Sequence, residues 1–417
     1  MFKFVHAADL HLDSPLRGLS AWEDAPVDAI RSATRRALNA LVDLCIRERV
    51  AFLIIAGDVY DGDWPDYSTG LFFSRCMARL QAEGIRVFLI RGNHDAASQI
   101  TKRLVLPDNV VEFPAEAPQT CRLDELGVAI HGQSFAQRET RENLALAYPA
   151  PIPGAFNIGV LHTSAEGQEG HETYAPCRVD DLVHKGYDYW ALGHIHRRQI
   201  LHERPFVVYP GNLQGRNIRE TGEKGCTLVT VDGDAVRLEH RTLDVLRWYV
   251  CEVNLTGART EEDFLAAVCG EMGRMVAENP GSPLALRVRL TGRTSLHGRL
   301  MNDVQRFLSE VRNAAQMTAG DDIWVEKVKV ETLPETRAAV TPGQQDALAA
   351  LLASVASAGE DDTFLDDFLR HARDIQNRMG SALKSRGIVW MESREDVAPL
   401  LADAEALLLS LLGKEAD

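Results

Sequence analysis

Five short polar motifs follow one another along this chain, and each comes directly after a run of apolar residues. In chain order the motifs are Asp9-Leu10-His11, Gly57-Asp58-Val59-Tyr60-Asp61, Gly92-Asn93-His94-Asp95, Leu161-His162 and Gly193-His194-Ile195-His196. The apolar runs before them have the length and composition of buried strands. Open α/β sheets bind ligands outside the carboxyl ends of their strands. The pattern therefore predicts that these distant residues meet in one polar site at a sheet edge.

Taken alone, most of these motifs have a structural explanation. An Asp-x-His is common by chance, a Gly-Asp pair can start a turn, and a lone His162 is more often a buried, hydrogen-bonded histidine than a ligand. The last motif is more specific, because alternate residues of a strand point to the same side and would direct both imidazoles one way. Together, the five motifs favour a ligand-binding site over chance.

Strands and helices alternate through the first part of the chain. Residues 26–49 and 68–83 have the apolar periodicity of helices, and the segments VAFLIIAGD and IRVFLIRGNHD have the composition of buried strands. Further strand-like runs follow as far as a hairpin turned at Asp232-Gly233-Asp234. This order predicts a two-sheet α/β core over residues 1–245.

The predicted order of strands and helices changes after about Leu246. Residues 246–333 alternate as strand, helix, strand, helix, strand, which predicts a separate small α/β domain with helices at 261–278 and 301–316. Residues 334–417 are helical and acidic, with a helix-start signal at Thr341-Pro342 and apolar stripes in 364–369 and 400–412. These stripes fit either a docking site for a partner or packing on the chain's own first domain.

Composition favours a cytoplasmic protein. No apolar run is long enough to cross a bilayer, and polar Asp9 and His11 interrupt the first residues, so neither a membrane span nor a signal peptide is expected. The seven cysteines are scattered without a CxxC pair. This spacing favours reduced core residues over a disulfide framework or a zinc site.

The formal net charge of −15 bears on the substrate. A protein that binds DNA alone usually carries a basic excess, because neutralising phosphates releases counterions. An acidic chain indicates one of two things. Either the substrate is not a long polyanion, or metal ions and a partner protein supply the positive charge.

The residue types in the motifs are those of a metal centre. Imidazole suits transition metals whereas carboxylate and amide oxygens suit harder ions, so this mixture favours Mn²⁺, with Fe²⁺, Zn²⁺ or Mg²⁺ as alternatives. The motifs offer too many ligands for one ion and enough for two if a carboxylate bridges. Two ions about 3.5–4 Å apart can lower the pKa of a shared water and clamp both oxygens of a displacement at phosphorus.

The motifs resemble those of the calcineurin-like metallophosphoesterase superfamily. The segments GDVYDGDWP, RGNHD, LHTSAEGQEGHETYAPC, DYWALGHIH and VVYPGN are similar to the SbcD nuclease subunit and its YhaO-like bacterial relatives. The resemblance covers residues 1–245. It implies a two-sheet αββα sandwich with a small α/β capping domain at 246–333 and a helical C-terminal region at 334–417.

The resemblance also implies roles for single residues. One metal ion would be held by Asp9, His11, Asp58 and His196, and the second by Asp58, Asn93, His162 and His194, with Asp58 bridging. His94 would protonate the leaving oxygen or donate a hydrogen bond to the transition state, and Asp95 would orient His94. Asp61 would lie behind the ligands. Arg197 and Arg216 could hold a phosphate backbone, or they could be ordinary surface charges.

For the whole protein the resemblance implies a two-metal DNA nuclease. It would act as a 3′-to-5′ exonuclease on duplex ends and as an endonuclease on single strands, as a homodimer working with an SbcC-type coiled-coil ATPase. A phosphatase or phosphodiesterase for small substrates is the first alternative, supported by the acidic charge. A scaffold that keeps metal ions for structure is the second, and the presence of His94 argues against it.

Overall fold

The computed structural model describes residues 1–14, 27–61, 67–97, 105–166, 174–335 and 361–385, together with isolated positions between 353 and 404. These residues divide into two compact units. The first comprises residues 1–250, 276–287 and 319–326, and the second comprises residues 251–275, 288–318 and 327–417. All five motifs belong to the first unit.

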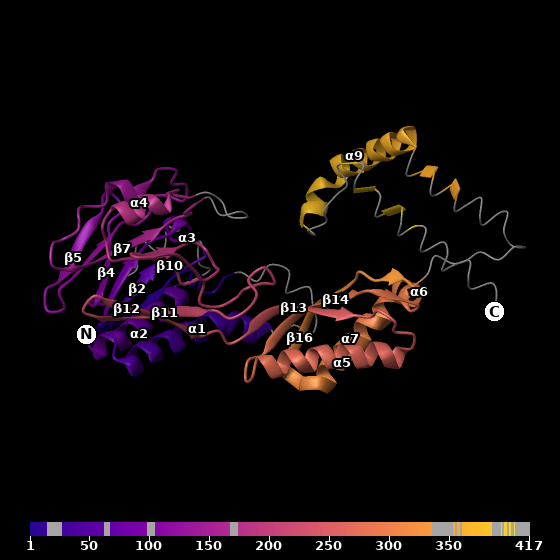
Figure 1. Cartoon of the computed structure of the whole chain (residues 1–417), viewed down its shortest axis with the longest axis horizontal. Coiled ribbons are helices and arrows are strands. Elements are labelled where there is room, and N and C mark those ends of the chain that lie inside the picture. The colour runs from indigo at the N-terminus through magenta and orange to yellow at the C-terminus, as the bar shows by residue number, and fades with distance from the viewer. Residues whose placement is uncertain are drawn as a thin grey trace, which may run out of the picture. The chain divides into compact units, whose positions relative to one another are not determined.

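Six strands form the first sheet of this unit, in the order β12-β11-β1-β2-β3-β4. Strands β1 to β4 are parallel, and the β11–β12 hairpin pairs antiparallel with β1. The helices α1 and α2 cover its outer face (Figure 1), where their apolar side chains are buried against the sheet. The bounds are β1 Phe2–Ala7, β2 Phe52–Ala56, β3 Arg86–Ile90, β4 Val110–Glu112, β11 Gly225–Asp232, β12 Ala235–Thr242, α1 Val27–Glu48 and α2 Ser68–Ala82.

The second sheet also has six strands, in the order β5-β6-β7-β8-β10-β9. Its four inner strands are parallel, and the edge strands β5 and β9 are antiparallel to their neighbours. The 3-10 helix η3 and the helix α4 contribute to the cluster on its outer face. The bounds are β5 Gln119–Leu123, β6 Val128–Gly132, β7 Phe156–His162, β8 Tyr189–Gly193, β9 Gln199–Glu203, β10 Phe206–Tyr209, η3 Leu144–Ala147 and α4 Val179–His184.

The main core lies between the two sheets. Phe4 stacks on Phe52 with ring centroids 5.0 Å apart, and Phe88 meets Phe52 edge-on at 5.7 Å. Tyr189 from the second sheet contacts Phe4 edge-on at 5.4 Å. Offset and edge-on pairs of this kind add to the free energy of burying the rings. The predicted two-sheet αββα fold is confirmed.

The parallel strands place their carboxyl ends, and with them the five motifs, at the same edge of the sandwich. Ala56 at the end of β2 pairs with Ile90 at the end of β3, and His162 of β7 pairs with Gly193 of β8. The N–H of Asp9 donates to the carbonyl of Gly57 at 3.0 Å, which extends the β1–β2 pairing into the motifs.

After β12 the chain continues as strand, helix, strand, two helices and strand, with a three-stranded sheet in the order β13-β14-β16. The helix expected at 301–316 is interrupted at Asp303, where α6 ends before α7 begins. The bounds are β13 Arg247–Asn254, α5 Glu261–Glu278, β14 Leu284–Thr291, β15 Arg293–Thr294, α6 His297–Asn302, α7 Val304–Ala319, η4 Gly320–Asp322, β16 Ile323–Val330 and β17 Leu333–Pro334.

The C-terminal region contributes the helix α9, Asp362–Ser385. The carboxylate of Asp361 accepts hydrogen bonds from the N–H groups of Thr363 and Phe364, so it caps the start of this helix. The expected helix start at 341–342 and most of the stripe at 400–412 lie outside the described residues. In the part of the chain that the structure describes, no helix is both long and apolar enough to cross a bilayer.

Candidate metal centre

Side chains from all five motifs converge at the shared strand edge. Three overlapping groups of potential metal ligands form there, each with its ligand atoms within 4.8 Å of one another. The groups are Asp9 with His11 and His196, His11 with Asp58 and His94, and Asp9 with Asp58 and His162. Because the groups share members, they make one continuous cluster.

His11 and His196 define one side of this cluster. The Nδ1 of His196 donates a hydrogen bond to Oε1 of Glu220 at 2.8 Å, which directs its Nε2 into the cluster as the ligand atom. That Nε2 lies 3.1 Å from Nε2 of His11 and 3.9 Å from Oδ1 of Asp9. Two imidazole nitrogens and a carboxylate oxygen therefore face one point.

His162 and Asn93 define the other side. The Nδ1 of His162 donates to the carbonyl of Ala56 at 2.9 Å, and its Nε2 lies 3.0 Å from Oδ1 of Asn93 and 3.5 Å from Oδ2 of Asp58. The same Oδ2 of Asp58 is 3.8 Å from Nε2 of His11. Asp58 is thus a carboxylate common to both sides.

His194 contacts both sides of the cluster in different ways. Its backbone N–H donates to the carboxylate of Asp9, at 3.1 Å to each oxygen. Its ring packs against the ring of His162, with centroids 5.3 Å apart, and against Tyr174 at 5.5 Å. The structure therefore brings all seven predicted ligands together, although His194 belongs to none of the three ligand groups.

The backbone of the centre is strained. Four of the predicted ligands have a left-handed backbone, with φ of 53° at Asp9, 42° at His11, 53° at Asp58 and 103° at His194. Each such residue costs on the order of 1–3 kcal/mol, and it persists only where the surrounding fold imposes it. Here the imposed backbone turns the side chains from the strand ends into the cluster.

Burial and close packing set the charges of the centre. Burial alone would raise the pKa of Asp58, but the imidazoles of His162 and His11 instead hold it well below its usual range. Burial opposes a charge on His162, yet the carboxylate of Asp58 raises the pKa of His162 to about 9. Burial raises the pKa of Asp9 to about 6. The protein alone thus keeps Asp58 anionic, which is the state that binds a cation.

These residues fit the binding of divalent cations. His162 and His196 each donate from Nδ1 to a protein oxygen, so Nε2 is the nitrogen left to face a metal ion. The Nδ1 of His11 is buried without a hydrogen-bond partner in the described structure. A buried polar atom without a partner needs an explanation, and an ion bound at this side chain would supply one. The oxygen and nitrogen donors match the preferences of divalent transition metals.

The carboxylate that contacts His94 is Asp61. The Nδ1 of His94 lies 2.7 Å from Oδ1 of Asp61, and this contact raises the pKa of His94 although burial opposes it. Ser14 donates to the other oxygen of Asp61 at 2.5 Å. The side chain of His94 is 33% exposed, whereas those of His11 and His162 are fully buried. Among the clustered histidines, His94 is therefore open to a substrate.

Asp95, which is expected from the resemblance to orient His94, makes its hydrogen bonds elsewhere in the described structure. The carboxylate of Asp95 accepts the backbone N–H groups of Val59, Tyr60 and Gly92 at 2.9–3.2 Å, and these contacts direct it away from the imidazole. Burial and the charge of Asp58 raise its pKa to about 7. Through these hydrogen bonds Asp95 links the turn that carries Asp58 to the turn that carries Asn93.

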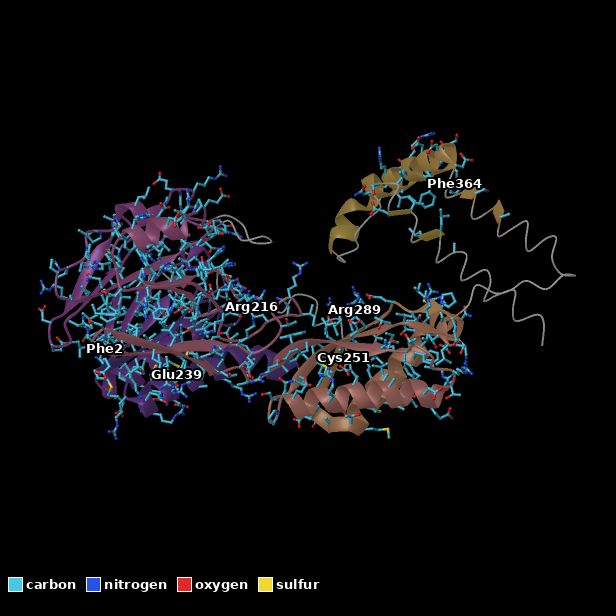
Figure 2. The ribbon with its side chains drawn as sticks, viewed as in Figure 1. Phe2, Arg216, Glu239, Cys251, Arg289 and Phe364 are labelled. Carbon is cyan, nitrogen blue, oxygen red and sulfur yellow. The ribbon has the colours of Figure 1, made fainter. Side chains whose placement is uncertain are left out.

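Two arginines are predicted from the sequence to lie near the substrate. Arg197 is exposed, directly after His196. Arg216 (labelled in Figure 2) is largely buried and forms an ion pair with Glu220 at 2.8 Å. Sequence reasoning missed Glu220, which contacts a predicted ligand, because nothing in its local sequence distinguishes it among the 60 acidic residues of the chain.

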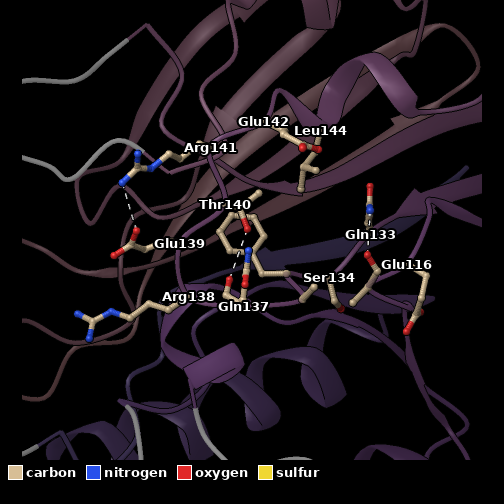
Figure 3. A pocket seen from close by; sticks show the side chains of 13 residues that line it. Glu116, Gln133, Ser134, Gln137, Arg138, Glu139, Thr140, Arg141, Glu142 and Leu144 are labelled. Atoms are coloured by element: carbon tan, nitrogen blue, oxygen red, sulfur yellow. Dashed lines mark hydrogen bonds and ion pairs between the residues drawn. The ribbon is translucent and has the colours of Figure 1, made fainter.

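A cavity of about 770 Å³ opens beside the centre (Figure 3). It is lined by the loop after β6, by Ala115 and by Glu116, and its charged groups include Arg138 and the ion pair of Arg141 with Glu139. Phe135 in its lining meets the ring of His162 edge-on, with centroids 5.5 Å apart. Phe135 would therefore separate a molecule in this cavity from the predicted ligand His162.

Gly193→Ala is expected to unfold the centre locally and to lower the melting temperature. A Cβ at this position would overlap the carbonyl oxygen of Ala56 and crowd Nδ1 of His162. Overpacking of this kind costs about 1–3 kcal/mol. Gly270→Ala is the matched control, since a Cβ on that helical glycine meets nothing within 4 Å. Alanine is also the better helix former of the two residues. Thermal unfolding of both proteins checks this, and equal melting temperatures would contradict it.

Comparison with known proteins agrees with the geometry. Residues 2–198 match the family model of calcineurin-like phosphoesterases, and residues 248–333 match the middle domain of the metallophosphoesterase YhaO. The metallophosphoesterase YhaO of Bacillus subtilis is 37% identical over 69% of this chain and 71% of its own length.

More distant relatives are named as repair and nuclease proteins. The DNA double-strand break repair protein Mre11 of Sulfurisphaera tokodaii is 24% identical over 62% of this chain and 67% of its own length. A subunit of the nuclease SbcCD from Staphylococcus saprophyticus is 22% identical over 59% of this chain and 70% of its own length. With its two-sheet fold, its clustered ligands and its likeness to YhaO, the chain belongs to the calcineurin-like metallophosphoesterase family.

Proposed function

We propose that this chain is a two-metal phosphodiesterase that cleaves DNA. The observation that carries the proposal is the cluster itself, in which Asp58 is shared by two sets of ligands and the partly exposed His94 lies beside them. We assign Asp9, His11 and His196 to one divalent ion, Asn93, His162 and His194 to the other, and Asp58 to both. Mn²⁺ is the ion that we expect, with Fe²⁺, Zn²⁺ or Mg²⁺ as alternatives.

In this proposal the metal ions and the side chains of the protein have different chemical roles. Two divalent ions bound there would supply a nucleophile at neutral pH and neutralise charge on the phosphoryl group. His94 is the general acid in this proposal. Its Nδ1 is held by Asp61, so its Nε2 can carry a proton to the leaving oxygen. Asp61 keeps the imidazole oriented and favours its protonated form.

The choice of DNA as substrate is supported by the relatives that are named as double-strand break repair and nuclease proteins. From the resemblance of the motifs to SbcD-type nucleases, we further propose 3′-to-5′ exonuclease action on duplex ends, endonuclease action on single strands, a homodimer, and an SbcC-type coiled-coil ATPase as partner. The free state of all seven cysteines fits a cytoplasmic location. Arg138 beside the cavity and Arg197 are exposed cations that could contact a phosphate backbone.

We propose three functional regions along the chain. Residues 1–245 carry the phosphoesterase centre, residues 246–333 form a capping domain for the substrate, and residues 334–417 include a docking segment for the partner. Phe364 supports the last assignment, because it is 41% exposed on α9.

A small-substrate phosphodiesterase or phosphatase is the second candidate, and the net charge of −15 favours it. The two candidates are separated by measuring Mn²⁺-dependent hydrolysis of bis-p-nitrophenyl phosphate and of linear duplex DNA by the same preparation. Cleavage of both is expected, because a nuclease centre also accepts an activated diester. Fast ester hydrolysis with intact single-stranded and duplex DNA would reject the nuclease. Hydrolysis of neither substrate, with Mn²⁺ bound, would instead indicate a metal-bearing scaffold.

A further inference from the structure

Glu220 is a buried carboxylate in the loop between β10 and β11, and its two oxygens meet groups that need an acceptor. One oxygen lies 2.8 Å from Nδ1 of His196 and 2.8 Å from a guanidinium nitrogen of Arg216. The other accepts the backbone N–H of Arg216 at 2.8 Å and the side-chain amide of Asn212 at 2.9 Å. These partners hold the pKa of Glu220 well below its usual range although burial opposes this.

Arg216 extends this network to the other side of the cluster. Its guanidinium lies 3.5 Å from Oδ2 of Asp61 and 3.5 Å from Oγ of Ser14, while Glu220 holds its opposite edge. Asp61 in turn contacts His94. Glu220 therefore contacts His196 directly and reaches the Asp61–His94 pair through Arg216.

The loop that carries Glu220 and Arg216 is fixed at both ends. The indole N–H of Trp248 donates to the carbonyl of Gly215 at 3.0 Å, and the N–H of Gly222 donates to the carbonyl of Trp248 at 3.0 Å. The side-chain amide of Gln214 donates to the carbonyl of Leu246 at 2.7 Å. Trp248 belongs to the first compact unit, as the loop does. The position of Glu220 is thus set by the fold and does not depend on the substrate.

We propose that Glu220 is the positioning residue of the metal centre, holding His196 in its ligand orientation and Arg216 against Asp61. This inference rests on the proposed function, because it takes His196 to hold a metal ion. A carboxylate behind a metal-bound histidine fixes the ring and its tautomer, and removing such a partner weakens metal binding or activity by roughly 10–100-fold. Through Arg216, the same carboxylate also helps to position Asp61, which contacts the proposed general acid His94.

The test uses Glu220→Gln, which keeps the size of the side chain but removes its charge. Mn²⁺ binding to the metal-free protein is measured by calorimetry, and hydrolysis of bis-p-nitrophenyl phosphate is measured as a function of Mn²⁺ concentration. One of the two Mn²⁺ affinities is expected to fall by roughly 10–100-fold. Part of the lost turnover should return at high Mn²⁺. Glu220→Asp, which keeps the charge, should lose less affinity than Glu220→Gln.

Two further variants separate positioning from general stability. Glu326→Gln removes a partly buried carboxylate that pairs with Arg287 at 2.7 Å, and it is expected to shift the melting temperature without changing Mn²⁺ affinity. Arg216→Lys keeps the charge but loses the planar fork. It should lower kcat on the order of tenfold, the effect of one lost charge-assisted contact, with Mn²⁺ affinity preserved.

The outcomes distinguish this inference from the proposed function. Wild-type protein that takes up none of Mn²⁺, Fe²⁺, Zn²⁺ and Mg²⁺ would remove the proposed function. Wild-type uptake of two ions, with the same affinities and the same turnover in folded Glu220→Gln, would overturn the role of Glu220 alone. If Glu220→Gln does not fold, Glu220→Asp decides between these results, because unchanged Mn²⁺ affinity and turnover in that variant would also overturn the role.

Discussion

Asp58→Asn is expected to abolish phosphodiester hydrolysis while the protein stays folded. Asp58 approaches a histidine on each side of the cluster, His11 and His162, so its loss weakens both sets of ligands. Bound metal ions supply several kcal/mol of transition-state stabilisation, so the rate should fall on the order of a thousandfold or more. Asparagine keeps the oxygen that accepts the N–H of His94, which preserves the turn.

Metal-dependent thermal unfolding gives a readout that needs no substrate. A ligand that binds only the folded state stabilises it by about 2.7 kcal/mol at a hundred times its Kd. Mn²⁺ should therefore raise the melting temperature of the wild type and have little effect on Asp58→Asn. Asp244→Asn is the matched control, because Asp244 has a buried side chain that pairs with Arg247 outside the cluster. Wild-type turnover and Mn²⁺ uptake in Asp58→Asn would contradict the bridging role.

His94→Gln is expected to lower kcat by roughly 10²–10⁴-fold, the usual contribution of a general acid, while both Mn²⁺ ions still bind. The imidazole is only partly buried, so its removal takes away a proton donor and leaves the buried ligands in place. Calorimetry with Mn²⁺ and turnover of bis-p-nitrophenyl phosphate on the same samples separate the two effects. A loss of one bound Mn²⁺ would show that His94 is a ligand, as its place in a ligand group also allows.

The pH profile tests the Asp61–His94 pair. An acid must be protonated, so kcat/KM should fall as pH rises through the pKa of His94, which Asp61 raises. Asp61→Asn removes the group that raises this pKa, and the falling limb should therefore move to lower pH. Asp95→Asn should leave the limb in place, because Asp95 contacts backbone N–H groups and not the imidazole. An unmoved limb in Asp61→Asn would exclude His94 as the titrating acid.

The sequence predicts the two-sheet fold and the meeting of the five motifs, because both follow from the order of the apolar runs and the polar motifs that end them. Apolar runs of strand length end at polar motifs, and parallel strands must bring those ends to one edge. The sequence does not reveal which carboxylate meets His94. Asp61 and Asp95 are both near in the chain, and only the path of the turns after β2 and β3 decides which one points at the imidazole.

Glu220 illustrates a second limit. It lies 24 residues from His196, and their contact depends on the return of the chain through β9 and β10 before the loop closes on the centre. The break between α6 and α7 at Asp303 is a third example, since the apolar periodicity continues across it. Contacts that depend on the path of a loop are not encoded in spacing alone.

The left-handed backbone at Asp9, His11, Asp58 and His194 has a consequence for how this centre could be lost. Glycine adopts such φ values without steric strain, so Asp58→Gly relieves strain while it destroys the centre. A chain selected only for folding stability would have no reason to keep strained backbone at these positions. The strained ligands are therefore themselves a sign that this protein is kept for its chemistry and not for its shape.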